Sequence, residues 1–344
     1  MTTYTAVGKP ITRQEGPDKV SGNFQYAADV NLPGMIWGKV LRSPYPHAKI
    51  VKIDISRASQ LPGVHAIITG EDTKGMRVGR LIRDVPLLAE DRVRFVGEKV
   101  AAVAAIDADT AEEAIGLIEV EYEPLPAIFD PVDAIAPGSP LVHEGSPSFQ
   151  AGSSSVEPQG NILDLSTWSN GDLDQGFKDS DFIFEHTFTT TWVHQGYMEP
   201  YACVVNINNE GRIEVWANNK VPFTLRRQIS DAMNISEEQI VVHPCGIGGD
   251  FGGKSPAMNV PLAYMLSKKA GYPVKMVMSY IEELMAGNPR HPSVVTIKTG
   301  VKKDGTFVAR HSKVIFNGGA SVSYTHLRAH ETRHDLVCRL LLEK

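Results

Sequence analysis

The sequence predicts a mixed α/β fold that is divided into two domains. The chain has 344 residues, and at roughly 100–200 residues per domain this is enough for two domains, each with a core of its own. Short apolar segments typical of strands recur along the chain and are interrupted by amphipathic helical segments. A stretch rich in Pro, Gly and Ser over residues 129–160 separates the two parts and is interpreted as a linker.

Composition and charge exclude several classes of protein. The chain is 42% hydrophobic and 22% charged, as is usual for a soluble globular protein. It carries 34 Lys and Arg residues against 40 Asp and Glu residues, for a formal net charge of -6, so we expect no nucleic-acid partner. No segment approaches the ~20 apolar residues of a membrane span, and no signal peptide is recognisable. We therefore expect a cytoplasmic protein.

Cysteine usage restricts the cofactors that this chain can hold by itself. The three cysteines, Cys203, Cys245 and Cys338, form no CxxC pair. This pattern indicates a reducing compartment, and it excludes an iron–sulfur cluster or a structural zinc site built from this chain alone.

The first predicted domain covers residues 8–128. The apolar run at 93–106 predicts a strand that is buried on both faces. Asp109 and Thr110 are expected to cap the helix that follows, which runs to Ile118. Further strands are predicted at 35–41, 50–53, 64–69 and 120–129, with a short helix at 56–61.

The second predicted domain covers residues 161–320. Its last two strands, at 293–301 and 306–316, are expected to form a hairpin, because the pair Asp304-Gly305 tolerates the positive φ of a tight turn. The other predicted strands are at 182–191, 202–207, 213–217, 240–243 and 273–278, and helices are predicted at 173–177, at 223–233 and in a segment that ends near Gly271.

Residues 321–344 do not fit the pattern of the rest of the chain. His326, His330 and His334 are spaced by four, so on a helix they would share one face and could hold a metal ion. The stretch also resembles a translated sequencing-adapter read-through, and we interpret it as a non-native tail.

The segment with the clearest chemical potential is a glycine cluster, GIGGDFGG, at residues 246–253. It follows a predicted strand and precedes a predicted helix. Its backbone N–H groups can converge on an anion or on a metal-oxo group, because few Cβ atoms block the approach. A close-packed glycine turn with positive φ would explain the same residues.

A nucleotide-binding protein is the alternative function. The segment that begins at Gly248 and ends at Ser255 fits the P-loop pattern G-x-x-x-x-G-K-[ST]. A P-loop helix starts at the Gly-Lys pair, however, and would contain Pro261 in its interior, where proline breaks a helix. Asp250 would also place a carboxylate among the phosphates.

Two further segments carry candidate polar groups. Gln195, in the sequence HQGYMEP at 194–200, could donate an amide hydrogen to an oxo ligand. The second segment is RHP at 290–292. Ordinary polar turns explain both segments when each is considered alone.

Six motifs occur together in a fixed order, and they carry a family resemblance. They are LRSPYPHAKI at 41–50, GEKVAAV at 97–103, HQGYMEP at 194–200, GGDFGGK at 248–254, RHP at 290–292 and NGGA at 317–320. Over about residues 8–320 the chain resembles the molybdenum-binding large subunit of the xanthine dehydrogenase/aldehyde oxidase family, in a C-terminally truncated form.

This resemblance implies both a fold and an activity. Residues 8–128 would be the α/β-hammerhead domain, and residues 161–320 the first molybdopterin-binding domain. The family's enzymes oxidise an aldehyde or an N-heteroaromatic carbon with water as the oxygen source. The implied cofactors are molybdopterin, in its cytosine dinucleotide form, together with [2Fe–2S] and FAD on partner chains. The implied partners are an iron–sulfur subunit and an FAD subunit, assembled as a dimer of heterotrimers.

The resemblance also assigns roles to particular residues. Phe251 and Gly252 match the Phe-Gly pair whose backbone lies against the molybdenum ligands, and they are flanked by Gly249, Asp250 and Gly253. Gln195 would take the role of the glutamine that hydrogen-bonds the apical oxo group.

Ser255 stands on the substrate side, where purine-oxidising members have a glutamate. A serine cannot make the same charge-assisted contact, so xanthine is not the expected substrate. The family's catalytic glutamate and most pterin contacts are expected beyond Ala320, and no residue of this chain is expected to ligate the metal directly. We therefore expect the isolated chain to be inactive and to bind no cofactor stably; a non-catalytic scaffold with the same fold is a further alternative.

Overall fold

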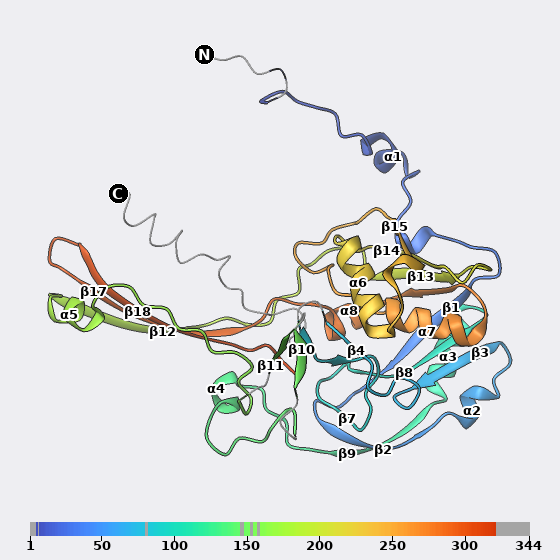
Figure 1. The fold of residues 1–344 in the computed structure, drawn as a ribbon, viewed down its shortest axis with the longest axis horizontal. Coiled ribbons are helices and arrows are strands. Elements are labelled where there is room, and N and C mark those ends of the chain that lie inside the picture. Colours follow the sequence, from blue (N-terminus) through green and yellow to red (C-terminus); the bar gives the residue numbers. More distant parts are fainter. Residues whose placement is uncertain are drawn as a thin grey trace.

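The computed structural model describes residues 5, 7–79, 82–144, 148–151, 154–156 and 159–320. It consists of a mixed helix-and-strand body from which a long, narrow ribbon of strands projects (Figure 1). The histidines at 326, 330 and 334 and the predicted tail lie outside the described residues.

A seven-stranded mixed sheet forms the centre of the body, in the order β15-β14-β13-β16-β1-β8-β3. Its strands are β1 (Ile36–Arg42), β3 (Val64–Thr69), β8 (Lys99–Ala105), β13 (Ala202–Ile207), β14 (Ile213–Ala217), β15 (Ile240–Pro244) and β16 (Val274–Val277). Strands from the two predicted domains meet where β1 pairs in parallel with β16, with Ile36 opposite Val274. Strands from both sides of the predicted linker therefore belong to one sheet.

The largest apolar core is shared by the two predicted domains. It joins Ile36 and Ala104 from the first part to Val205, Leu262 and Val274 from the second. The expectation that each part buries a separate core is therefore wrong for this main core. The physical reason is the edge of β1, whose backbone N–H and C=O groups would be buried without partners if β16 did not pair with it.

Strand β8 is buried on both faces, as its apolar run predicts. Ala102 and Ala104 point into the main core, whereas Ala101 and Val103 point into a second apolar cluster. Helix α7 (Val260–Ala270) contributes to the main core, and helix α3 (Ala108–Gly116) contributes Ala114 to the second cluster. The two helices therefore cover opposite faces of this part of the sheet.

Helix α3 begins earlier than predicted. Its N-cap is Asp107, whose side chain accepts a hydrogen bond from the backbone N–H of Thr110, and Asp109 lies inside the first turn. The sequence offers two aspartates two residues apart, and the extended backbone at Asp107 (φ -147°, ψ 174°) is what makes it the cap.

The remaining sheets of the body are small. The predicted strands at 35–41 and 50–53 both form, but the second enters a separate sheet of β7 (Arg92–Val93), β2 (Ala48–Asp54) and β9 (Glu119–Pro124). The short strands are β4 (Arg77–Val78) paired with β6 (Val85–Pro86), and β5 (Ile82–Arg83), β10 (Phe149–Ala151) and β11 (Ser154–Val156) in one sheet. The predicted linker thus contains β10, β11 and helix α4 (Pro131–Ala134).

The other helices are short, with one exception. Helix α6 (Pro222–Met233) buries Leu225 and Ile229 against the main core. The short ones are α1 (Gly16–Ser21), η1 (Ala27–Asp29), α2 (Ser56–Ser59), α5 (Leu173–Lys178), η2 (Glu237–Gln239) and α8 (Tyr280–Ala286). No helix in the described part of the chain combines the length and the apolar character that a membrane crossing requires.

The projecting ribbon is a three-stranded antiparallel sheet, in the order β12-β17-β18 (Figure 1). It contains β12 (Phe182–Thr189), β17 (Ser293–Val301) and β18 (Phe307–Phe316). The predicted hairpin is confirmed, because β17 pairs with β18 and Gly305 in the turn has a φ of 88°. The base of β17 brings residues 290–292 back to the body, where the candidate site lies.

Candidate functional site

The glycine cluster forms a loop between β15 and α7. Three of its residues have positive φ: Gly249 (104°), Phe251 (43°) and Gly252 (102°). Positive φ is unusual for a phenylalanine and stores strain, so the surrounding contacts must hold this bend. The Phe251 side chain is 63% exposed and so supplies little of that support.

An ion pair fastens both ends of the loop to the segment at 194–201. The ammonium of Lys254 is fully buried and lies 2.6 Å from Glu199 Oε2. The same oxygen accepts a 2.6 Å hydrogen bond from the backbone N–H of Gly248. The ammonium also lies 4.6 Å from the centroid of the Tyr197 ring, a cation–π distance. Glu199 thus contacts both Gly248 and Lys254, which stand on either side of the strained residue Phe251.

This geometry contradicts the nucleotide-binding alternative. In a P-loop the lysine reaches phosphate oxygens and the helix begins at the Gly-Lys pair. Here the Lys254 ammonium is enclosed with Glu199, and α7 begins only at Val260. Pro261 stands in the first turn of α7, where proline is tolerated. The helix therefore begins next to the proline and not at the Gly-Lys pair, as a P-loop helix would.

Asp250 organises the interior of the loop. Its carboxylate accepts hydrogen bonds from the backbone N–H groups of Gly252 (3.1 Å) and Lys254, and it forms a 2.8 Å ion pair with Lys220. Partial burial would raise the pKa of this carboxyl, but the contacts with Lys220 and the two N–H groups outweigh it and hold the pKa below its usual range. Asp250 is therefore an ionised brace within the loop.

The backbone amides at the tip of the loop take no part in holding it together. Within the described part of the chain, the backbone N–H groups of Gly249, Asp250 and Phe251 have no hydrogen-bond acceptor. Three consecutive N–H groups without an acceptor among the described residues, in a bend that contains positive φ angles, are available to donate to oxygen ligands.

Gln195 lies directly against this loop. A Cβ added at Gly253 would come within 3.1 Å of Gln195 Oε1 and 2.7 Å of Tyr197 Cε1, so a larger residue there would force these side chains to shift. Gln195 Nε2 donates to the carbonyl oxygen of Asn288 at 2.7 Å, whereas its Oε1 is buried with no partner among the described residues. The structure thus brings together Gln195 and Gly253, which lie far apart in the sequence.

The third candidate segment, at 290–292, joins the same place. The Arg290 guanidinium donates to the carbonyl oxygen of Phe251 at 3.2 Å, which supports the strained residue directly. The backbone of Arg290 pairs with that of Val193, and the His291 ring lies 5.3 Å from the Trp192 ring. All three sequence segments therefore meet.

A buried carboxylate behind the loop was not identified from the sequence. Glu283, only 1% exposed, accepts a 2.7 Å hydrogen bond from the Tyr197 hydroxyl and another from the backbone N–H of Tyr201. The Tyr201 hydroxyl in turn donates to the carbonyl oxygen of Gly253. Burial, together with the hydrogen bond to Glu283, raises the pKa of Tyr197 strongly. The sequence places Glu283 in the acidic first turn of a short helix, a position that dipole effects alone explain.

Ser255 lies deeper than its predicted role requires. It is fully buried, and its carbonyl oxygen accepts a 3.4 Å hydrogen bond from Gln228 Nε2. Ser255 is not among the residues that line the large cavity near the loop. In this arrangement the serine contributes to packing beneath the loop.

The cavity itself lies between the two predicted domains. Its volume is about 790 Å³, in the range of sites that bind small molecules. His194, Asn288 and His291 line it beside the loop, and Arg42 and Lys99 line it from the first part of the chain. The loop residues at 248–253 flank this cavity without lining it.

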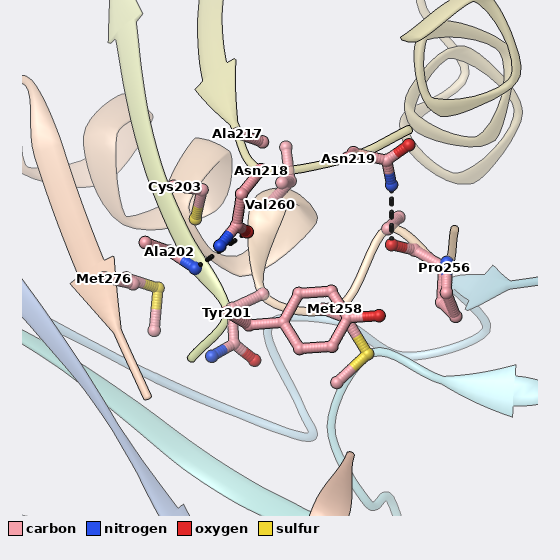
Figure 2. Close-up of a pocket in the computed structure, with 12 residues that line it drawn as sticks. Tyr201, Ala202, Cys203, Ala217, Asn218, Asn219, Pro256, Met258, Val260 and Met276 are labelled. Carbon is pink, nitrogen blue, oxygen red and sulfur yellow. Dashed lines mark hydrogen bonds between the residues drawn. The ribbon is translucent and has the colours of Figure 1, made fainter. Parts of the chain in front are cut away.

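A second, much smaller pocket lies behind the segment that leads into α7 (Figure 2). Asn218 accepts from the backbone N–H of Ala202 at 3.1 Å, and Asn219 Nδ2 donates to the carbonyl oxygen of Pro256 at 3.0 Å. With a volume of about 10 Å³ the pocket has room for about one water molecule. The two asparagines therefore position the chain around Pro256 and do not form a ligand site.

The residues of the loop fit an oxygen-rich cofactor. Three backbone N–H groups that lack an acceptor among the described residues lie close in the chain to Gly253, whose Cβ position is obstructed by Tyr197 and Gln195, and the loop stands beside a large cavity. No site of three or more His, Cys, Asp or Glu side chains that could bind a metal ion occurs among the described residues.

Two family profiles match this chain. The family profile described as "Molybdopterin cofactor-binding domain" matches residues 155–335, and the one described as "Aldehyde oxidase and xanthine dehydrogenase, a/b hammerhead domain" matches residues 21–126.

Three similar proteins illustrate the relationship. The chain is 38% identical over 91% of its length to a probable xanthine dehydrogenase subunit of Bacillus subtilis, of which it covers 40%. It is 32% identical over 93% of its length to the "Nicotinate dehydrogenase large molybdopterin subunit" of Eubacterium barkeri, of which it covers 72%. A crystal structure of the Cu,Mo-CO dehydrogenase superposes with a TM-score of 0.80 at 31% identity, covering 89% of this chain and 40% of that one.

The chain therefore spans about two fifths of the length of the Bacillus subtilis relative and of the CO dehydrogenase chain. Its hammerhead segment, its cofactor-binding segment and its agreement with these proteins in both sequence and fold lead to one conclusion: this chain belongs to the xanthine dehydrogenase/aldehyde oxidase family and corresponds to its molybdenum-binding large subunit.

Proposed function

We propose that this chain supplies a cofactor-facing loop of a molybdenum hydroxylase that oxidises an aldehyde or an N-heteroaromatic carbon, with water as the source of oxygen. The observation that carries the proposal is the bend at Phe251, where three open N–H groups lie beside Gln195 and Gly253. When bound, a molybdopterin cofactor would supply Lewis acidity and the capacity to accept electrons.

The chain's own residues would orient the cofactor's oxygen ligands and hold the loop in its bent conformation. The N–H groups of Gly249, Asp250 and Phe251 present donors toward oxygen ligands, and Gln195 faces the same loop. Gly252 and Gly253 allow close backbone approach. Glu199, Lys254 and Arg290 hold the bend in place through their contacts with its ends and with the Phe251 carbonyl.

The wider setting is part of the same proposal. The cofactor would be the cytosine dinucleotide form of molybdopterin, and electrons would pass to [2Fe–2S] and FAD on separate iron–sulfur and FAD subunits in a cytoplasmic dimer of heterotrimers. We also propose that the hammerhead domain spans residues 8–128 and the first molybdopterin-binding domain residues 161–320. Ser255, buried beneath the loop, offers no charged contact to a purine, which favours aldehyde or N-heteroaromatic substrates over xanthine.

The test is isotope labelling in the assembled complex that contains this chain. Aldehydes and N-heteroaromatics are supplied with a dye acceptor in water enriched in ¹⁸O, and the product is analysed by mass spectrometry. Label in the product is the expected result. Oxygen that originates from O₂, or a purified complex without molybdenum, would refute the proposal.

The isolated 344-residue chain is expected to bind no cofactor stably and to turn nothing over, because one loop with a few donors buries little of a large cofactor. Metal analysis of the chain expressed alone measures this. Molybdenum present in a one-to-one ratio to protein would show that the expectation is wrong.

A further inference from the structure

The wall of the large cavity carries an unusual charge for a protein with an overall charge of -6. Arg42, Arg94 and Lys99 line it from the first part of the chain, and the one carboxylate among its described lining residues is that of Asp130. The acidic partners of these cations stand behind the wall, since neither Glu98 nor Glu282 is among the lining residues. The cavity is thus locally positive within an acidic protein.

Arg42 is the best-defined of these cations. Its side chain is 8% exposed, its Nε lies 2.9 Å from Glu282 Oε1, and its Nη1 donates to the carbonyl oxygen of Gly97 at 3.1 Å. Its second terminal nitrogen, Nη2, is buried and has no hydrogen-bond partner among the described residues. A buried guanidinium nitrogen without an acceptor is costly, so an acceptor that reached Nη2 would be stabilised.

Lys99 stands next to Arg42. Its ammonium donates to the carbonyl oxygen of Met258 at 3.3 Å, which leaves further N–H donors on that nitrogen. Burial lowers the pKa of Lys99 to about 8, and the nearby positive charge of Arg42 contributes to this. Two like charges held together at a cavity wall repel each other, and an anion between them would relieve the repulsion.

Three histidines complete the polar part of the wall. His47, His194 and His291 each line the cavity, and the Nε2 atom of each is buried without a hydrogen-bond partner among the described residues. Three residues that line the same cavity therefore each carry a ring nitrogen without a hydrogen-bond partner in the described part of the chain. Polar nitrogens of this kind favour a polar occupant of the cavity over an apolar one.

We propose that Arg42 and Lys99 form an anion-binding subsite that takes an oxyanion, either the carboxylate of an acidic substrate or a phosphate group. Arg42 Nη2 and the Lys99 ammonium would donate to the same anionic group, the guanidinium through its fixed planar donors and the ammonium as a point charge. The proposal concerns binding alone and does not depend on the proposed hydroxylase activity, because its test measures no turnover.

The experiment titrates the full chain with sodium benzoate and, separately, with inorganic phosphate in a calorimeter at constant ionic strength, with sodium chloride as the reference salt. Saturable binding of at least one oxyanion is expected. Lys99→Gln is expected to weaken it at least tenfold. Lys49→Gln removes the same charge from an exposed lysine of the same part of the chain, and should leave the Kd within twofold.

Arg42→Gln should weaken binding to a similar degree, with the exposed Arg57→Gln as its control. Circular dichroism checks that each variant is folded; if loss of the contact with Glu282 unfolds Arg42→Gln, the result for Lys99→Gln decides. Binding of benzoate alone identifies a carboxylate ligand, and binding of phosphate alone a phosphate ligand. No saturable binding of either anion, or unchanged binding in a folded Lys99→Gln variant, overturns the proposal.

Discussion

Glu199 and Lys254 form an enclosed ion pair, 2.6 Å between Oε2 and Nζ, in which the lysine side chain is fully buried and the glutamate side chain is 12% exposed. The pair connects a segment before β13 to the end of the glycine loop, 55 positions later in the chain. Because Gly248 donates to the same carboxylate oxygen, this one side chain contacts both ends of the segment from Gly248 to Lys254. The strained residue Phe251 lies between those two points.

Lys254→Met is expected to destabilise the chain by about 3–5 kcal/mol, because it removes the cation beside the buried Glu199 carboxylate and leaves only the hydrogen bond from Gly248 on that oxygen. The double variant Glu199→Gln/Lys254→Met removes both charges and should lose less than Lys254→Met alone. Urea unfolding followed by circular dichroism measures both. Lys220→Met, which breaks the more exposed pair with Asp250, is the control and should cost about 0–1 kcal/mol. Equal losses for the two single variants would contradict the assignment.

Gly253→Ala is expected to cost about 1–3 kcal/mol of stability, because its Cβ would stand 2.7 Å from Tyr197 Cε1 and 3.1 Å from Gln195 Oε1. Gly116→Ala, at the end of α3, is the matched control, since a Cβ there meets nothing within 4 Å. That control should be neutral or stabilising by a few tenths of a kcal/mol. Thermal unfolding of the two variants makes the comparison, and a neutral Gly253→Ala would show that the loop adjusts without strain.

Glu98 should make stability depend on pH. Burial raises the pKa of its carboxyl to about 7, despite the opposing backbone hydrogen bond from Arg94 and the charges of Arg94 and Lys99. A carboxyl whose pKa is higher in the folded state favours folding fully below its unfolded pKa near 4.5, and this contribution disappears as the pH rises through 7. The stability of the native chain relative to Glu98→Gln should therefore fall by roughly 3 kcal/mol between about pH 4.5 and 7.5.

Chemical denaturation of both proteins at several pH values measures this difference. Glu210→Gln, at an exposed turn, serves as the control variant and should track the native chain at every pH. A difference that stays constant with pH would mean that Glu98 titrates as an ordinary carboxyl.

Asp107→Ala is expected to destabilise the chain by about 1 kcal/mol, because Asp107 accepts the hydrogen bond from Thr110 at the start of α3. Asp109→Ala removes a charge from the first turn but no capping bond, so about half that loss or less is expected. Thermal unfolding distinguishes the two. A larger effect at Asp109 would restore the cap that the sequence suggested.

Local patterns in the sequence were enough to locate most of the longer strands and helices and to indicate the family, but not the short strands or the helix α4 within the predicted linker. Apolar periodicity located the central strands and the hairpin at 293–316, and β8 could be identified as buried on both faces from its uninterrupted Val and Ala residues. Pro261 already argued against a P-loop, because proline is tolerated in the first turn of a helix but breaks its interior, where a P-loop helix would place it. Six ordered motifs indicated the family, which the matched domains confirm.

Which segments lie beside which could be known only from the folded chain. The pairing of β1 with β16, the enclosure of Lys254 by Glu199 and the contact of Gln195 with Gly253 each join residues that are far apart in the sequence. Periodicity reports which face of an element is apolar, but it carries no information about which distant element covers that face. The positively charged cavity wall around Arg42 and Lys99 also could not be predicted from the sequence. The burial of these side chains and the unpaired nitrogen of Arg42 exist only in the folded chain.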